Sequence, residues 1–251
     1  FMKLLRLGTK RIQLSTVKND SLLKQKFIHE YRFSDSDVDE IPHPCNPIRD
    51  RLDSAEALHQ LRLDGRSVIL IFGYIRRGKG FEVALEALNK IKQEIPNVLL
   101  LIAGKVQDLE SSTYLVQLKK MIQELGLEES VRFDSHYIPD DEVPLYFSAA
   151  SIILVPYTES VGASGPIHNY AGYGTPIIAA NVGYHMRETL GGTLTLFMNR
   201  DSADLAHKVI TLLDDNELRK ELVAKQCKYV ANESWDVAAK RTMQNYERII
   251  F

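Results

Sequence analysis

Cysteine is scarce in this sequence, and that scarcity excludes a fold held together by disulfides. Only two cysteines occur among the 251 residues, and Cys45 and Cys227 lie far apart without the partner ligands of a zinc-binding motif. We therefore expect two reduced thiols that behave as small hydrophobic side chains, as in cytoplasmic proteins, and we expect no metal site.

Long apolar runs and an excess of charge of one sign are also missing. No apolar stretch approaches the ~20 residues of a membrane-spanning helix, and the opening FMKLLRLGTKR is too short and irregular for a secretory signal. Lysine and arginine total 31 against 33 acidic residues, so no cationic face for nucleic acid is expected. We expect a cytoplasmic protein without a membrane span, with a peripheral membrane location as the alternative.

The first 47 residues form a segment of different character. A short strand is predicted at 11–15, a helix at about 20–31 and an acidic loop at 34–40. The segment ends in IPHPCNP at 41–47, where three prolines disfavour regular structure and predict a stiff linker. This segment is too small for a sheet domain of its own, so we expect a remnant or an edge attachment of another domain.

From residue 66 onward, apolar strands alternate regularly with amphipathic helices. Six strands are predicted, at 68–73, 98–104, 131–133, 152–155, 176–180 and 193–197. Helices are predicted at about 80–94, 112–125, 140–150, from 164, 185–190, 202–213, 216–230 and 235–250. Fully apolar strands between helices indicate an α/β protein with a Rossmann-like parallel sheet and helices on both faces. The last two helices have no strand after them, so they are expected to pack outside or to reach across to another domain.

In an open parallel sheet the ligand binds outside the carboxyl ends of the strands. The loop after the first predicted strand, 73–80, combines three glycines with Arg76, Arg77 and Lys79, a composition that can bring the backbone close to a pyrophosphate and neutralise it. The alternative is a solvated turn with basic residues. Neither the P-loop nor the GxGxxG spacing is present.

A second candidate is the helix start at Ser164-Gly165-Pro166. Ser164 is a good N-cap, Pro166 suits the first turn, and the glycines leave room for a phosphate to reach unpaired backbone N–H groups. The alternative is an ordinary well-capped helix. His136 and Tyr137 follow another strand at the same edge and could contact a ligand or simply be solvated. With no catalytic triad evident, these residues indicate a binder of a phosphate-bearing ligand more firmly than any reaction.

The order of these motifs resembles the C-terminal, donor-binding domain of retaining, nucleotide-sugar-dependent glycosyltransferases of the GT-B fold, of the group 1, family 4 type. The match runs from about Ile41 to Tyr246. Its pieces are the strand ending in Gly73 with Lys79-Gly80 six residues on, the Leu101–Gly104 strand end, Phe133–Pro139, Leu145–Pro156, Gly174-Thr175-Pro176 and Ser234-Trp235.

The resemblance implies a role for each candidate residue. Lys79 and Arg77 would be the catalytic cations, and the donor diphosphate would lie against Gly78, Lys79, Ser164, Gly165 and Ile167. The nucleotide base and ribose would lie near His136, Tyr137, Ile138, Asn169 and Glu159. The donor is a nucleotide-diphosphate sugar that acts as co-substrate, and neither a cofactor nor a metal is expected. The acceptor, a glycan or lipid-linked sugar, would bind to an N-terminal domain.

Two departures from the family pattern weaken these assignments. Tyr74 stands where an arginine usually follows the strand-ending glycine, so Arg76 or Arg77 would have to supply its charge. Asn169 and Val161 stand where two glutamates are expected, unless a shift of register lets Glu159 serve. Two alternatives therefore stay open: a non-catalytic nucleotide-sugar-binding module, and a nucleotide-sugar epimerase that would use His136, His168 and Glu159.

The resemblance also predicts three parts of the chain. Residues 1–47 would be a remnant of the N-terminal acceptor domain with its linker, 48–232 the nucleotide-sugar-binding domain, and 233–251 a crossover helix. We expect this chain alone to bind a nucleotide but to transfer sugar poorly or not at all, because the acceptor side is missing.

Overall fold

The computed structural model describes residues 12–16, 21–48, 51–159, 165–183 and 189–250. Its centre is a six-stranded parallel sheet in the order β5-β4-β3-β6-β7-β8. The strands are β3 Ser67–Phe72, β4 Val98–Ala103, β5 Val131–Asp134, β6 Ile152–Val155, β7 Ile177–Asn181 and β8 Thr195–Met198. The predicted α/β fold class and its six strands are confirmed.

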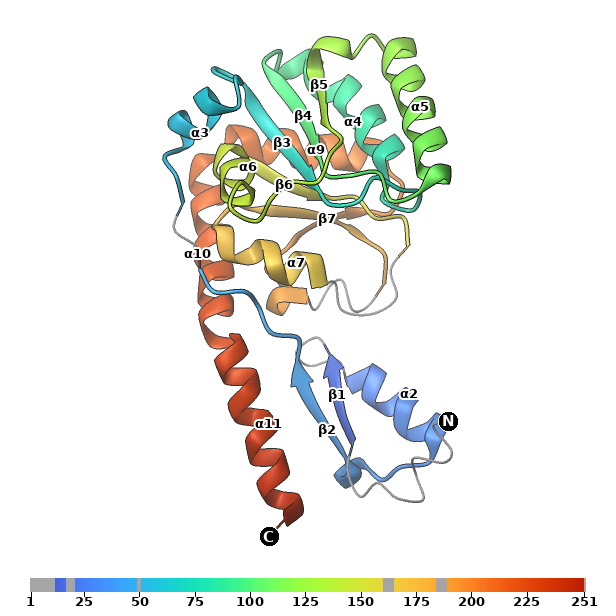
Figure 1. Ribbon diagram of the computed structural model, residues 1–251, viewed down its shortest axis with the longest axis vertical. Coiled ribbons are helices and arrows are strands. Elements are labelled where there is room, and N and C mark those ends of the chain that lie inside the picture. The colour runs from blue at the N-terminus through green and yellow to red at the C-terminus, as the bar shows by residue number, and fades with distance from the viewer. Residues whose placement is uncertain (1–11, 17–20, 49–50, 160–164, 184–188, 251) are drawn as a thin grey trace.

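Helices cover both faces of this sheet because its strands are apolar on both sides (Figure 1). Along β3, Ile69 and Ile71 join a core with α4 Phe81–Glu94, α5 Leu109–Glu124 and α9 Ser202–Asp214. Val68 and Leu70 point the opposite way, into a second core with α3 Ser54–Gln60, α6 Val143–Ala149, α7 Gly165–Tyr170 and α10 Asn216–Asn232. The two-residue period of a strand sends alternate side chains into the two cores.

Helix boundaries differ from the sequence expectation where capping decides them. α5 begins at Leu109, three residues early, because the Asp108 side chain accepts a hydrogen bond from the Ser111 N–H at 2.8 Å. α3 was not predicted, although Asp53 caps it by accepting from Ala55 and Glu56. Residues 140–142 form a turn before α6. Of the helix predicted at 185–190, residues 184–188 lie outside the described residues, and a 3-10 turn spans Thr189–Gly192.

The N-terminal segment is a small strand–helix–strand unit. β1 Ile12–Thr16 and β2 Val38–Pro42 pair in parallel, with α2 Ser21–Tyr31 between them in the chain. The acidic loop expected at 34–40 is therefore wrong in part, since it holds a 3-10 turn, Asp35–Asp37, and most of β2. β2 forms because Val38 and Ile41 are buried, and its proline stands at the strand end, where a missing N–H is tolerated.

The last helix joins this small unit to the six-stranded sheet. α11 Trp235–Ile250 follows α10 after a break and packs against β2, as Figure 1 shows. At the break, the Cys45 N–H donates to the Glu233 carbonyl at 2.8 Å and Trp235 Nε1 donates to Asn46 Oδ1 at 3.2 Å. The linker and the start of α11 are therefore fastened together.

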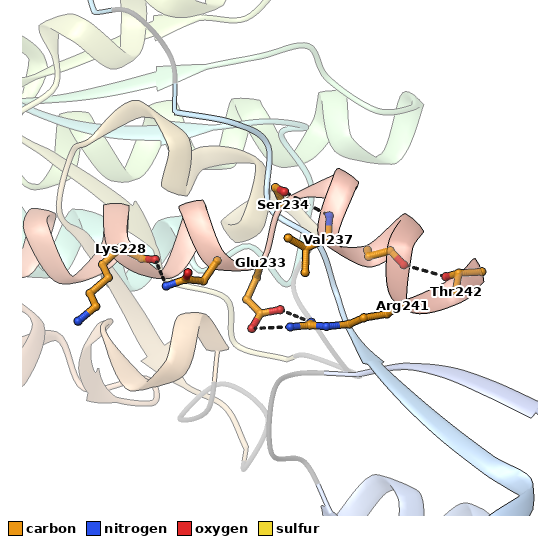
Figure 2. A network of polar contacts seen from close by, with 8 residues as sticks. Lys228, Glu233, Ser234, Val237, Arg241 and Thr242 are labelled. Carbon is orange, nitrogen blue, oxygen red and sulfur yellow. Dashed lines mark hydrogen bonds and ion pairs between the residues drawn. The ribbon is translucent and has the colours of Figure 1, made fainter. Parts of the chain in front are cut away.

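An ion pair between a buried carboxylate and a partly exposed guanidinium stabilises the break between α10 and α11 (Figure 2). The Glu233 side chain is 1% exposed, and its partner Arg241, eight residues later on α11, is 36% exposed. Burial raises the pKa of the nearby Cys45 thiol to about 12, with a further contribution from Glu233, so this thiol stays protonated. Both cysteines are free, as expected. No helix among the described residues is long and apolar enough to cross a membrane.

We expect Arg241→Met to lower the free energy of unfolding by about 2 kcal/mol, between the values for exposed and fully buried pairs, because it removes a partly exposed guanidinium from a buried carboxylate. Lys220→Met on α10 is the matched control, since the Lys220–Glu217 pair is exposed and its loss should cost less than about 1 kcal/mol. Urea unfolding at pH 7 measures both variants. Equal losses of unfolding free energy in the two variants would contradict a structural role for the Glu233–Arg241 pair.

Candidate functional site

The carboxyl ends of four strands meet at one edge of the sheet, and the loops after them surround two hollows. β3 and β6 are neighbours although they are not consecutive, and ligands of open parallel sheets bind at such a switch point. The aromatic hollow, of about 170 Å³, is lined by Phe72, Gly73, Tyr74, Gly104, Lys105, Tyr137 and Ile138. The cationic hollow, of about 360 Å³, is lined by Arg76, Arg77, Gly78, Lys79, Tyr157, Thr158 and Glu159.

Two glycines let these loops touch at the level of the backbone. A β-carbon on Gly80 would overlap the carbonyl oxygen of Pro156, and one on Gly104 would overlap that of Gly73. Both glycines have positive φ, 75° and 139°, which side-chain-bearing residues rarely adopt. The loops after β3, β4 and β6 are thereby locked together around the two hollows.

Lys79 is the most perturbed cation of the site. Its Nζ lies over the Tyr157 ring, 3.8 Å from the ring centroid, a distance typical of a cation–π contact. Burial, and secondarily the charge of Arg76, lowers the pKa of Lys79 to about 8. Burial also raises the pKa of Tyr157 to about 12, so the ring beneath the ammonium is a neutral phenol. An anion entering the hollow would relieve this unfavourable burial of charge.

The two arginines of the same loop point in different directions. The Arg77 guanidinium stacks on the Tyr114 ring at 4.7 Å and donates to Gln117 Oε1 at 2.6 Å, so its head is engaged with α5. Arg76 donates to the Arg77 carbonyl at 3.2 Å, and its charge adds to the lowering of the Lys79 pKa. This geometry favours Arg76 over Arg77 as the second cation beside Lys79.

The aromatic hollow has the composition of a site for a flat ring. Tyr74 and Tyr137 are 50% and 62% exposed, which leaves their rings accessible, while Ile138 is buried beneath. Lys105 Nζ lies 5.6 Å from the Tyr74 ring centroid. Aromatic faces with an apolar floor can stack a heterocycle, and adjacent backbone groups can bond its edge. His136 is exposed and is not among the lining residues.

A buried carboxylate at the end of a neighbouring strand was missed from the sequence. Asp134, at the end of β5, accepts from Arg132 Nε at 2.8 Å and from the Tyr146 hydroxyl at 3.0 Å. These bonds fix the strand end from which the His136–Ile138 loop leaves. Alternation along the strand puts Arg132 and Asp134 on one face, and that spacing could have indicated the pair.

The start of α7 is only partly described. Ser164 and Gly162 lie outside the described residues, and α7 begins at Gly165. Ile167 is fully buried in the core, so its side chain is not available to a ligand. The linker approaches this point, since His43 Nε2 lies 3.8 Å from the position of a β-carbon on Gly165 and the His43 ring is 4.7 Å from that of His168.

The two candidate ribose ligands lie in different surroundings. Asn169 is exposed on α7 and does not line either hollow, whereas Glu159 lines the cationic hollow. The Glu159 carboxylate is 81% exposed, and its oxygen lies 3.9 Å from the Arg200 guanidinium. Within the described part of the chain, no group of three or more His, Cys, Asp or Glu side chains is arranged to hold a metal ion.

Substituting the glycines of the 73–80 loop should separate steric contact from backbone strain. Gly80 and Gly78 have φ of 75° and 80°, so alanine is strained at both, but only at Gly80 does it meet the Pro156 carbonyl. We expect Gly80→Ala to cost about 1 to 3 kcal/mol more than Gly78→Ala in urea unfolding. Equal costs would show that the loops after β3 and β6 do not depend on close approach.

The model of the family described as Glycosyl transferases group 1 matches residues 54–228. The phosphatidyl-myo-inositol mannosyltransferase of Mycobacterium leprae is 28% identical over 215 residues, 85% of this chain and 54% of that protein. The D-inositol 3-phosphate glycosyltransferase of Corynebacterium efficiens is 30% identical over 185 residues, 71% of this chain and 42% of that protein.

Solved structures agree on the fold. Anabaena HepE, crystallised in complex with UDP, superposes with a TM-score of 0.83 over 98% of this chain and 66% of its own, at 17% identity. The present chain spans about half the length of the curated relatives it matches. The chain belongs to the glycosyl transferases group 1 family, and its six-stranded unit is one Rossmann-like half of the GT-B fold.

Proposed function

We propose that this chain is the donor-binding half of a retaining glycosyltransferase that takes its sugar from a nucleotide diphosphate. The observation that carries the proposal is the position of Lys79, a partly buried ammonium that lines the cationic hollow at the end of the same loop whose first residues line the aromatic hollow. A nucleotide diphosphate joins a flat base to a charged diphosphate, so one loop that serves an aromatic and a cationic hollow matches the two parts of that donor. Retention of configuration rests on the motif resemblance.

In this arrangement the base lies in the aromatic hollow between Tyr74 and Tyr137, over Ile138, with His136 at its rim. By the motif resemblance, the diphosphate would also lie against Ser164, Gly165 and Ile167, of which Ser164 lies outside the described residues. Ribose hydroxyls would bond Asn169 or Glu159. Because Glu159 lines the cationic hollow and Asn169 lines neither, Glu159 is the better-supported ribose ligand.

Catalysis by this half would be electrostatic. Negative charge builds on the diphosphate as the glycosidic bond breaks, and a cation held in a water-poor site stabilises that charge without reorganising. Lys79 and Arg76 are placed to do this, with Arg77 one residue away and turned toward α5. Gly78 presents its backbone in the same hollow.

The acceptor would bind outside this half. The names of the two relatives, an inositol-lipid mannosyltransferase and an inositol-phosphate glycosyltransferase, add inositol compounds to the acceptors worth testing beside glycans and lipid-linked sugars. The unit of β1, α2 and β2 is proposed as the edge of the acceptor domain, and α11 as the crossover helix that returns to it. We further propose that this chain alone binds a donor but does not turn it over.

A non-catalytic nucleotide-sugar-binding module is the second candidate, because Asn169 replaces a carboxylate and does not line either hollow. Full-length protein that binds donor without transferring sugar would support it. The epimerase alternative has less support, since His168 is fully buried and His136 is exposed away from the cationic hollow.

Binding of UDP, GDP and ADP, with and without their sugars, tests the proposal. We expect at least one to raise the unfolding temperature of this chain and to give a measurable Kd by calorimetry. Lys79→Met should weaken that binding about tenfold or more, because a charge-assisted contact is lost, while Lys120→Met on the exposed face of α5 should not. Absence of binding by every nucleotide would overturn the proposal.

The same binding should depend on pH above neutrality. Protonated Lys79 is the form that binds an anion, and its pKa of about 8 rises when the diphosphate arrives. Affinity is therefore full below pH 8 and falls as the pH rises above 8, a range in which the nucleotide's own phosphates are already ionised. Calorimetry from pH 6.5 to 9.5 should show this fall in the wild type and not in Lys79→Met. The other charged groups of the hollow are Arg76, Arg77 and Glu159.

A further inference from the structure

The position of the Lys79 ammonium depends on a contact with another segment of the chain. A free lysine side chain carries about 2 kcal/mol of rotamer entropy, which ligand binding would have to overcome if the ammonium were mobile. Here the ammonium already rests on the face of the Tyr157 ring at 3.8 Å, a contact that the aromatic quadrupole stabilises. The Tyr157 ring belongs to the segment after β6, whereas Lys79 lies in the loop after β3. A residue that follows the neighbouring strand therefore holds the ammonium in place.

The backbone on both sides of Lys79 is held by that same segment. The Thr158 N–H and its hydroxyl both donate to the Gly78 carbonyl, at 3.1 and 3.4 Å. On the other side, Gly80 packs directly against the carbonyl of Pro156. Residues 156–158 therefore hold the backbone on both sides of Lys79 as well as its ammonium.

A third element holds this segment in turn. Asn199, just after β8, donates from Nδ2 to the Thr158 carbonyl at 3.2 Å. Because β8 is the edge strand two places from β6, the bond ties the loop at the switch point to the far side of the sheet. The contacts of Thr158 run in two directions, toward Gly78 and toward Asn199.

We propose that Tyr157 and Asn199 are positioning residues for the phosphate-facing lysine, acting through a clamp of Pro156, Tyr157 and Thr158 that sets Lys79 before the donor arrives. The inference rests on the proposed function for its meaning, since a preset cation matters only if an anion binds there. Preorganisation of this kind raises affinity by removing an ordering cost from the binding step. The proposal gives Tyr157 and Asn199 a role that acts through the position of Lys79.

Substitutions at Tyr157 separate the ring from its hydroxyl. Tyr157→Phe keeps the aromatic face, so the Lys79 pKa should stay near 8 and UDP affinity should change less than about twofold. Tyr157→Leu keeps an apolar neighbour but loses the face, so the Lys79 pKa should fall and UDP affinity at pH 7.5 should drop about fivefold. NMR titration of ¹³C-labelled lysine side chains reports the pKa, and calorimetry reports the affinity.

Asn199→Ala provides a second variant if the leucine substitution unfolds the chain. Loss of the bond to Thr158 should free the loop, so the Lys79 pKa should rise toward that of an ordinary lysine while UDP affinity falls several-fold. Asn97→Ala, which removes an exposed side-chain bond to the Gly65 carbonyl at the opposite edge, is the control and should change neither quantity.

The outcomes separate this inference from the proposed function. Identical Lys79 titration in wild type, Tyr157→Leu and Asn199→Ala would overturn the clamp, whether or not any nucleotide binds. A perturbed Lys79 that responds to the variants as expected, in a chain that binds no nucleoside diphosphate, would keep the clamp as a structural fact and overturn its role in donor binding. Equal UDP affinity in all variants would overturn the positioning role alone.

Discussion

The site depends on the close contact between loop backbones at the carboxyl edge of the sheet. Where Gly80 meets Pro156 and Gly104 meets Gly73, no side chain separates the loops after β3, β4 and β6. Glycine makes such an approach possible at a conformational cost that the packed sheet beneath offsets. The aromatic and cationic hollows depend on these loops being held together, and Lys79 and Tyr74 are positioned by that fixed frame.

Burial gives this frame its electrostatic character. An ammonium at an open surface keeps its hydration and interacts weakly with an anion, whereas Lys79 is partly stripped of water and has Arg76 for a neighbour. The unliganded site therefore holds unfavourable positive charge, which is offset by the Tyr157 ring. A diphosphate bound there, as proposed, would gain part of its binding energy from relief of that charge. A chain whose net charge is close to zero can therefore still have a local region of strong positive potential that attracts anions.

The sequence was sufficient to predict the sheet, but it was not sufficient to predict the directions in which the side chains of the site point. Apolar runs such as Val98–Ala103 are buried on both faces, so composition alone specified strands and their parallel pairing. The choice between Arg76 and Arg77 could not be predicted, because it depends on Tyr114 and Gln117 of a helix some forty residues later. β2 was missed for a related reason: its acidic residues hide two buried hydrophobic positions, Val38 and Ile41, whose partners lie on other elements.

The bond between the Cys45 N–H and the Glu233 carbonyl ties the linker to the start of α11, and His43, two residues before Cys45, lies against the first residue of α7. The linker therefore contacts both the last helix and the helix start to which the motif resemblance assigns the diphosphate. The placement of the β1–α2–β2 unit and that of the start of α7 thus share one short stretch of chain.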